Sequence, residues 1–418
     1  MSSEARRATG QEAWIIDGVR SPRGKGKSNG ALHHIHPQEL LAQVLNALKT
    51  RTGINPADVD DVIVGNGNSV GDQGACIGRM AVLAAGWPVV APGITLNRFC
   101  GSGQQAVTYA GMGIQAGHQD LVVGAGVESM SRWPVDNSPP DFASGNAALR
   151  DLFPLVPQGI SADLIATVEG FSREDVDAFA LQSQQRAAVA MAEGRFDRSL
   201  VVITNPDGSV ALAHDEFARP TTTAEGLAKL SPSFAGMGGQ VFEGFETSFD
   251  DMCRQVYPHA GEIQHVHHAG NSSGVVDGAS AILMASPNYA KAHGLVPRAR
   301  IIMSAVIGSE PVIMLTAPGA ASQRCLDRAG MTVADIDLFE INEAFAAVPL
   351  KTMRDLGLDP ALVNVSGGAI ALGHPIGATG PMLIQTALDE LERRDLHTAL
   401  ITMCTGGGMG TATIIERI

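Results

Sequence analysis

The chain has 418 residues, of which 45% are hydrophobic and 17% are charged. This length allows two domains, or one duplicated domain with an insertion, and the composition is that of a packed protein rather than a disordered one. The 29 basic and 43 acidic residues give a formal net charge of −14, which excludes the broad basic surface typical of nucleic-acid and anionic-membrane binding. We therefore expect no nucleic-acid partner, and an anionic ligand would need a local basic patch.

Neither a membrane span nor a secretory signal is visible. No apolar run approaches the roughly 20 residues that cross a bilayer, and Met1–Gln11 lacks an apolar core. The five cysteines are Cys76, Cys100, Cys253, Cys325 and Cys404. Their scatter, without a CxxC pair, favours a reducing compartment over disulfides or zinc, so we expect a cytoplasmic protein. Cys76 and Cys325 lie in helical patterns and are interpreted as structural.

Short apolar runs that predict buried strands alternate with Ala- and Gly-rich helical stretches. These runs are Ala13–Ile16, Val59–Val64, Leu121–Gly124, Ala281–Ala285, Leu338–Ile341 and Ala399–Met403. The alternation is typical of an α/β fold with a parallel or mixed sheet covered by helices. Asp58–Gly65 resembles Ala334–Ile341, and a second matching run follows each at a similar distance, which predicts two similar halves.

Between the halves, from Ser131 to about Ala269, Pro-rich pieces predict an inserted, loop-rich domain. We expect one helix from Ser172 to Gly194, because Ser172 and the acidic residues after it form an N-terminal capping pattern. A second helix is expected from apolar residues at helical spacing, namely Val241, Phe242, Phe245, Phe249, Met252 and Val256. This helix either docks on its own domain or forms a lid or wall for an acyl chain.

The segment NRFCGSGQQA places Cys100 where a strand pattern ends and a small-residue helix begins. Free N–H groups and the helix dipole at such a place favour a thiolate over a thiol. Gly101 and Gly103 would let the backbone approach a substrate. A structural, buried cysteine also fits this position, so the segment alone leaves both interpretations open.

Three later segments contain further candidate active-site residues. Asn342 follows a predicted strand in NEAF, and Cys404 follows another in CTGGGMG. His374 lies in GHPIGATG, where the flanking glycines leave more backbone clearance than packing requires. Neither CTGGGMG nor GAGVES completes GxGxxG in a βαβ setting, which argues against a nicotinamide-dependent oxidoreductase.

Two histidine groups invite a metal-site interpretation. Their members are His33, His34 and His36, and His265, His267 and His268. Neither group has partners at a convincing ligand spacing, so we expect solvated or capping histidines and no metal.

The segments NRFCGSG, NEAF, GHPIGATG and CTGGGMG, in this order, resemble the four active-site motifs of the thiolase family. AGNSSGVVDGA and GVESMS resemble further family segments, and the resemblance runs from about Ile15 to the end of the chain. It implies a thiolase-like, duplicated five-layer α-β-α-β-α core. The implied parts are an N-terminal half at 12–130 completed by about 275–298, an inserted loop domain at 131–274 covering the CoA and acyl site, and a C-terminal half at 299–418.

The resemblance also implies residue roles. Cys100 would accept the acyl group after activation by His374, and Cys404 would move a proton to or from the α-carbon. One oxyanion would be held by His374 and, through a water, Asn342; another would be held by the N–H groups of Cys100 and Gly406. The implied reaction is reversible, CoA-dependent cleavage of a 3-oxoacyl-CoA. Coenzyme A is then a substrate, and no cofactor is bound permanently.

The resemblance gives weaker support for the substrate-binding residues than for the catalytic residues. The implied CoA contacts are Arg219, Ala269 and Ser273, and the implied acyl-pocket residues are Met314, Ala344 and Phe345. Many thiolases carry His-Met-Gly where this chain has Pro157, Gln158 and Gly159, and Gly226 stands where a serine often contacts the nucleotide end. The chain also has an insertion between Phe234 and Ala269. We expect this insertion to help select the acyl chain.

Several alternatives stay open. A decarboxylating enzyme of the ketoacyl-synthase kind would need a second histidine in place of Asn342 and no Cys404. A non-catalytic acyl-CoA-binding paralogue would not need the four site residues together. A biosynthetic thiolase that forms acetoacetyl-CoA would use the same residues, because the condensation is reversible. The expected partners are coenzyme A, acyl-CoA thioesters and further copies of the chain, in a homodimer or homotetramer.

Overall fold

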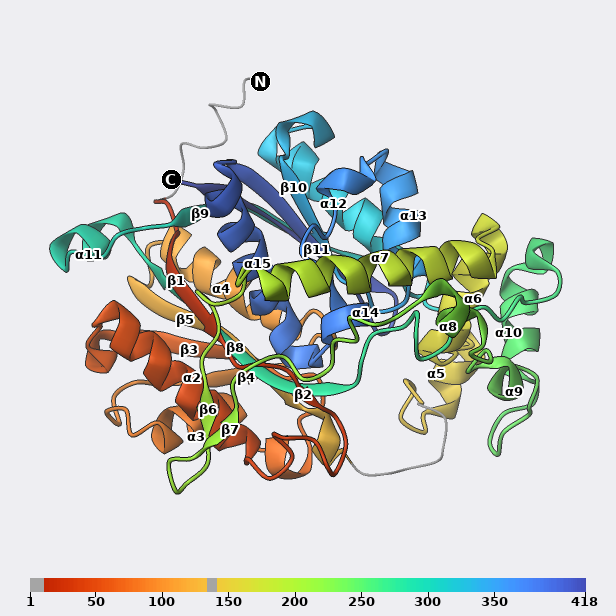
Figure 1. Cartoon of the computed structure of the whole chain (residues 1–418), viewed down its shortest axis with the longest axis horizontal. Helices are drawn as coiled ribbons and strands as arrows, with labels where there is room; N and C mark the ends of the chain where they lie inside the picture. Colours follow the sequence, from red (N-terminus) through yellow and green to blue (C-terminus); the bar gives the residue numbers. More distant parts are fainter. Residues whose placement is uncertain (1–10, 134–140) are drawn as a thin grey trace.

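The computed structural model describes residues 11–133 and 141–418. Their main β-sheet consists of two arms (Figure 1). The first arm consists, in spatial order, of β4 (Ile94–Leu96), β3 (Asp61–Gly65), β5 (Leu121–Ser129), β8 (Val276–Ala285) and β1 (Trp14–Arg20). The second arm continues with β9 (Ala299–Gly308), β12 (Met409–Arg417), β11 (Thr398–Thr405) and β10 (Leu338–Ile341). Strand β2 (Gly24–Lys25) pairs with β8. Among the described residues, the sheet passes from one arm to the other where Trp14 and Ile15 pair with Arg300 and Ala299.

The two arms repeat one topology, as the sequence predicts. In the first arm β3 and β5 are parallel, and β8 and β1 follow in antiparallel order. In the second arm β10 and β11 are parallel, and β12 and β9 follow in the same way. The similar segments Asp58–Gly65 and Ala334–Ile341 therefore end in the equivalent strands β3 and β10. All six predicted strands are confirmed.

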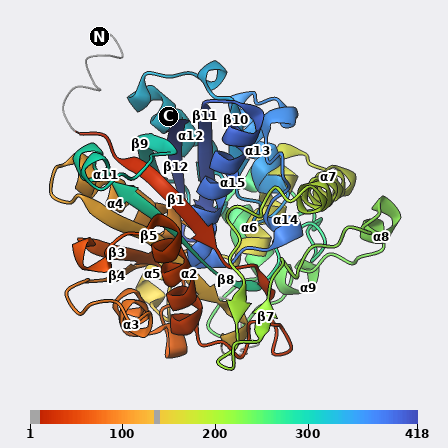
Figure 2. The same ribbon diagram turned by 60° about the vertical axis from the view of Figure 1, so that its left-hand side comes forward.

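Helices complete the five layers (Figure 2). Helices α4 (Ser102–Gln115) and α15 (Thr379–Arg394) lie between the arms and contact strands of both. The first arm is covered outside by α2 (Pro37–Thr52) and α3 (Ile77–Ala84), and the second by α12 (Ala317–Ala329) and α13 (Ala347–Leu356). Helix α11 (Pro287–Ala292) connects β8 to β9. The predicted α/β core with two similar halves is thus confirmed.

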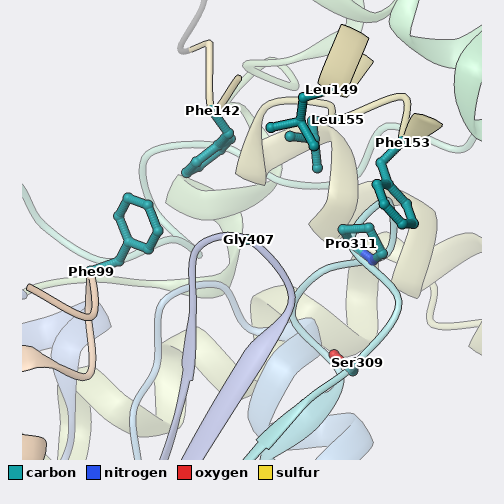
Figure 3. Close-up of a pocket in the computed structure, with 8 residues that line it drawn as sticks. All are labelled: Phe99, Phe142, Leu149, Phe153, Leu155, Ser309, Pro311 and Gly407. Atoms are coloured by element: carbon teal, nitrogen blue, oxygen red, sulfur yellow. The ribbon is translucent and has the colours of Figure 1, made fainter. Parts of the chain in front are cut away.

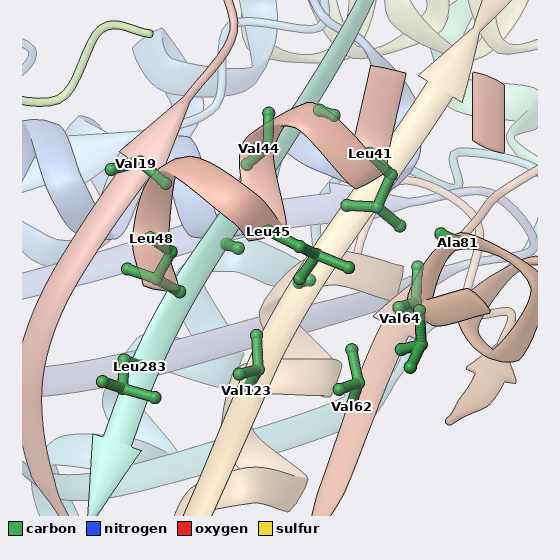
Figure 4. Close-up of a cluster of buried hydrophobic side chains, with 14 of the residues drawn as sticks. Val19, Leu41, Val44, Leu45, Leu48, Val62, Val64, Ala81, Val123 and Leu283 are labelled. Atoms are coloured by element: carbon green, nitrogen blue, oxygen red, sulfur yellow. The ribbon is translucent and has the colours of Figure 1, made fainter. Parts of the chain in front are cut away.

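Helix α2 illustrates how the layers are held. The side chain of His36 caps its start by accepting the N–H of Gln38, and Gly53 ends it with a φ of 68°. Its leucines and Val44 are buried over β8, β5 and β3, as Figure 4 shows. Burial of each such side chain stabilises the fold by about 1.5–3 kcal/mol.

The chain between β5 and β8 forms short elements joined by long loops. These are α5 (Ala147–Leu152), α6 (Gln158–Glu169), α7 (Arg173–Ala192), β6 (Ile203–Thr204), β7 (Val210–Leu212), α8 (Ala224–Ala228), α9 (Ala235–Gly238) and α10 (Phe249–Val256). Helix α6 packs on α13, and α7 packs on α14 (Ala369–Leu372), so this segment lies against the second half. Ser172 and Asp175 form the predicted capping box of α7. The domain bounds at 131–274 and 299–418 stay predictions.

The predicted helix from Val241 to Val256 is wrong over its first half. Gly244 takes a φ of 84°, and Ser248 caps α10 by accepting the N–H of Asp251, so the helix begins at Phe249. Phe242 and Phe245 instead fold back onto Phe249, with ring centroids 5.5 and 5.1 Å away. These rings join the apolar cluster of their own segment. This arrangement agrees with the alternative in which the segment docks on its own domain.

The expectation of solvated or capping histidines is wrong for the second group, whose side chains are largely buried and bonded to carboxylates. His265 and His267 both hydrogen bond to Asp163 of α6, and His268 bonds to Asp177 of α7. His36 caps α2, as noted above. Over residues 11–133 and 141–418, no helix has both the length and the apolar character needed to cross a membrane.

Candidate active site

The fold brings all four sequence motifs to one place between the halves. Cys100 precedes α4, Asn342 follows β10, His374 lies between α14 and α15, and Cys404 lies near the end of β11. The backbone N–H of Gly406 hydrogen bonds to the Cys100 thiol. The Nδ2 atom of Asn342 lies 3.4 Å from Nε2 of His374.

Glycines allow this close approach. A Cβ atom at Gly103 would collide with the carbonyl oxygen of Gly377, and one at Gly380 would collide with the backbone of Gln104. The start of α4, with Cys100 before it, therefore packs backbone to backbone against the loop that follows His374. These glycines are needed for contact between the halves, not for flexibility.

Cys100 is a buried thiol at rest. Burial raises its pKa to about 11, although hydrogen bonds from the Gln158 side chain and the Gly406 N–H act in the opposite direction. Our expectation that the start of α4 would favour the thiolate is therefore wrong, because burial outweighs the local donors. The preceding residue, Phe99, has a φ of 47°, a strained value for a bulky residue beside the candidate nucleophile.

His374 is placed to act as a base. Burial, together with the positive charge of Arg23, lowers its pKa to about 3, so the ring is neutral. Its Nδ1 lies 2.6 Å from Oγ1 of Thr379, whose own proton goes to the carbonyl of Pro375 at 3.0 Å. Nδ1–H is then the donor to Thr379, and Nε2 keeps its lone pair and receives the Asn342 N–H.

Cys404 is a second neutral thiol in the same site. It is fully buried, and burial followed by the nearby Cys100 raises its pKa well above the usual value. It can therefore hold a proton until an adjacent carbanion takes it. Asn342 is also buried, and its Oδ1 has no hydrogen-bond partner among the described residues.

Two polar residues of the site were missed as site residues by sequence reasoning. Gln158, at the start of α6, hydrogen bonds to Cys100; the sequence marked it only as a departure from the family pattern. Glu128, near the end of β5, accepts the N–H groups of Gly67 at 2.7 Å and Gly377 at 2.9 Å. Burial raises the pKa of Glu128 to about 7, and its charge raises that of Cys100. Its place in GVESMS was the available signal.

The implied substrate-binding residues fall into two groups. Arg219 and Ala269 line a cavity of about 220 Å³ beside α7 and α8. Ser273 donates its N–H to the carbonyl of Ala344 at 2.9 Å, so it lies against the NEAF segment. Met314 and Ala344 are buried in the same apolar cluster as Cys404, and Phe345 packs at its edge.

A second, larger cavity of about 390 Å³ is mainly apolar and lies beside the CTGGGMG turn (Figure 3). Phe99, the residue before the candidate nucleophile, is part of its wall, and so is Gly407. Two neutral thiols, a neutral histidine and a directed N–H donor next to this cavity define a site for cysteine-dependent acyl transfer.

Comparison with known proteins identifies the family. Residues 13–251 match the N-terminal thiolase domain and residues 295–417 match the C-terminal thiolase domain. The chain is 41% identical to the 3-oxoadipyl-CoA/3-oxo-5,6-dehydrosuberyl-CoA thiolase of Escherichia coli K12, covering 98% of this chain and 100% of the relative. It is 39% identical to the steroid 3-ketoacyl-CoA thiolase FadA6 of Mycobacterium tuberculosis, over 100% and 97%.

Among solved structures, human mitochondrial 3-ketoacyl-CoA thiolase in complex with CoA superposes with a TM-score of 0.82 at 33% identity, covering 98% of each chain. The chain belongs to the thiolase family, and it is an acyltransferase. The resemblance of the four motifs to this family is therefore confirmed.

Proposed function

We propose that the protein cleaves a 3-oxoacyl-CoA with coenzyme A, through an acyl group held on Cys100. The observation that carries this proposal is the meeting of Cys100, Cys404 and a neutral His374 in one buried site. Two thiols are needed because the reaction has two demands, a nucleophile at the carbonyl carbon and a proton for the α-carbon.

In the first half-reaction, Nε2 of His374 takes the proton of Cys100, and the thiolate attacks the C3 carbonyl. The resulting alkoxide collapses, the C2–C3 bond breaks, and its electron pair passes to C2 as the enolate of the departing acyl-CoA. Cys404 gives its proton to C2. The N–H of Gly406, already directed at the Cys100 sulfur, is placed to stabilise an oxyanion formed there.

In the second half-reaction, the thiol of coenzyme A attacks the acyl-Cys100 carbonyl. The Cys404 thiolate takes the proton of that thiol, and the protonated His374 returns a proton to the departing Cys100. Every group ends in its starting state. Asn342, which donates to His374 and has a free Oδ1, would hold a water that stabilises the thioester enolate.

Coenzyme A would reach the site along the segment between β5 and β8. We assign its nucleotide end to the cavity lined by Arg219 and Ala269, where the guanidinium provides a positive charge in an acidic protein. Ser273, which contacts the NEAF segment, would lie along the pantetheine arm. Met314, Ala344 and Phe345 would border the thioester. The protein would need no permanently bound cofactor.

We further propose a cytoplasmic homodimer or homotetramer. Support comes from edge strand β4, which among the described strands pairs with β3 alone, and from exposed apolar residues on or just before it, such as Val89 and Ile94. An unprotected edge with apolar neighbours is a common subunit contact.

The test is a thiolysis assay with purified protein, coenzyme A and acetoacetyl-CoA. Formation of two acetyl-CoA per substrate is expected in the wild type, and a loss of at least about 1,000-fold is expected in Cys404→Ala, by analogy with the removal of other catalytic acids and bases. The Cys76→Ala variant is the matched control, since Cys76 lies outside the site. Acetoacetyl-CoA cleavage that is equal in both variants would refute the proposal.

A further inference from the structure

The chemical steps proposed above do not depend on the cavity beside the CTGGGMG turn. Its size and lining can therefore indicate which acyl group the protein accepts. It measures about 390 Å³, and side chains of α5 and the residues around it form its outer wall. In Figure 3, Leu149, Leu155 and Phe153 lie above Pro311, and Phe142 faces Phe99. Such a volume, lined mainly by apolar side chains, is in the range of small-molecule pockets.

Contacts place this cavity next to the reacting atoms. The rings of Phe99 and Phe142 meet edge to face, with centroids 5.6 Å apart. A Cβ atom built on Gly406 would lie 2.8 Å from the Phe142 ring and 3.2 Å from the Phe99 ring. Because Gly406 lies against both rings and Phe99 directly precedes Cys100, we expect a bulky acyl group on Cys100 to extend toward these rings.

The charges around the cavity select against an acidic acyl chain. None of the side chains that line it, all within the described part of the chain, is charged. Glu310, between the lining residues Ser309 and Pro311, accepts the Tyr257 hydroxyl at 2.7 Å and the Val312 N–H at 2.9 Å.

The neighbouring cations do not compensate. Neither Arg150 of α5, which donates to the carbonyl of Gly244 at 2.9 Å and lies over the Phe245 ring, nor Arg98, next to Phe99 in sequence, is among the lining residues. A carboxylate in the cavity would therefore lose hydration without gaining a cation among the lining residues.

We propose that this cavity receives the acyl group of a bulky, uncharged 3-oxoacyl-CoA, and that the segment 142–155 sets its size. The inference rests on the proposed thiolytic function and names its substrate class. Ser309 adds one polar, uncharged side chain to this otherwise apolar lining. The Phe242, Phe245 and Phe249 rings, expected earlier to select the acyl chain, do not line the cavity.

The experiment compares four substrates with wild-type protein and two variants. The substrates are acetoacetyl-CoA, 3-oxohexanoyl-CoA, 3-oxoadipyl-CoA and 5-cyclohexyl-3-oxopentanoyl-CoA. Leu149→Trp fills the cavity. Leu152→Trp is the control: it makes the same change on the same helix, but the Leu152 side chain is 73% exposed and does not line the cavity. Thermal melts establish that both variants are folded.

In the wild type, kcat/KM should be highest for the cyclohexyl substrate and at least about tenfold lower for 3-oxoadipyl-CoA than for 3-oxohexanoyl-CoA. Leu149→Trp should lower kcat/KM for the cyclohexyl substrate at least about tenfold and change acetoacetyl-CoA cleavage less than about twofold. Leu152→Trp should change neither.

A preference for 3-oxoadipyl-CoA would overturn the inference, as would equal effects of the two tryptophans on the cyclohexyl substrate. Either result would leave the proposed function intact as long as acetoacetyl-CoA is cleaved. Failure to cleave any of the four substrates would instead refute the proposed function.

Discussion

Cys100 and His374 are both neutral in the unliganded site, although an active thiolate is usually pictured as a permanent ion pair with histidine. Burial raises the pKa of the thiol to about 11 and lowers that of the imidazole to about 3. Proton transfer between them becomes favourable only when an oxyanion or a thioester dipole compensates the new charges. In the proposed mechanism, the substrate therefore takes part in forming the thiolate.

Gln158→Met tests the hydrogen bond that this account assigns to the nucleophile. Methionine has a similar shape but no N–H, so the pKa of Cys100 should rise further and its alkylation by iodoacetamide at pH 9 should fall about tenfold, as expected for a lost hydrogen bond to a charged group. Alkylation rates of Cys100 measured against pH provide the check. An unchanged pH profile would show that Gln158 does not act on the sulfur.

At this scale the sequence points to candidate reactive groups more readily than to the residues that surround them. Cys100 and His374 stand in glycine-rich segments that are visible in the chain. The contribution of Gln158 depends on α6 packing beside a residue 58 positions earlier, and that of Glu128 depends on amide groups from both halves. No local pattern encodes either contact.

At the scale of elements, a buried ion pair attaches the inserted segment to β1. Asp215 accepts two hydrogen bonds from Arg20, each 2.8 Å long, and the Arg23 N–H at 2.8 Å. Burial acts to raise the pKa of Asp215, but the two arginines outweigh it and lower the pKa. Asp215→Ala should lower the free energy of unfolding by about 3–5 kcal/mol, because it leaves Arg20 buried and unpaired.

Urea denaturation of Asp215→Ala and of Asp207→Ala provides the measurement. Asp207 is in the same segment but exposed, so its removal should change the free energy of unfolding by less than about 0.5 kcal/mol. Similar losses in the two variants would mean that the ion pair does not anchor the segment.

His265 should make the inserted segment sensitive to alkaline pH. Burial lowers its pKa, but hydrogen bonds to Asp163 and Asp250 outweigh this effect and raise the pKa to about 9. Because the folded pKa lies above the unfolded value of about 6.5, the stabilisation is complete below pH 6.5 and is lost as the pH rises through 9. The Tm should therefore fall more between pH 6.5 and 9.5 in the wild type than in His265→Gln. Parallel curves for the two proteins would contradict this role.

Helices and strands can be predicted from the sequence where apolar periodicity and capping signals indicate the same element. The strands of the two halves and the capping of α7 could be predicted because apolar runs and the Ser172 box are local signals. The helix predicted before Phe249 could not hold, because Gly244 and Ser248 favour a turn and a cap within the same apolar stripe. Periodicity alone does not distinguish that stripe from a continuous helix.

At the scale of the whole molecule, the assembly should contain at least two copies of the chain. Edge strand β4 ends shortly before Cys100 in the chain, and Val89 and Val90 before it are exposed, so a second copy paired along β4 would also support the loop of the candidate nucleophile. Light scattering at micromolar concentration should give a multiple of 43.5 kDa. A mass of 43.5 kDa would contradict the proposed oligomer.

The duplicated fold explains why the proposed reaction would need both halves. The first half supplies Cys100 and the carboxylate of Glu128, and the second supplies His374, Asn342 and Cys404. Glu128 binds amides from each half, so relative movement of the halves would disturb the nucleophile and its base together. Chemistry and domain packing are therefore coupled in this protein.

The most direct test of the account is the mass of the protein after incubation with acetoacetyl-CoA and no free coenzyme A. The account predicts the gain of one acetyl group, mapped by peptide analysis to Cys100, and no gain in Cys100→Ser. An acetyl group on any other residue, or one that persists in Cys100→Ser, would contradict it.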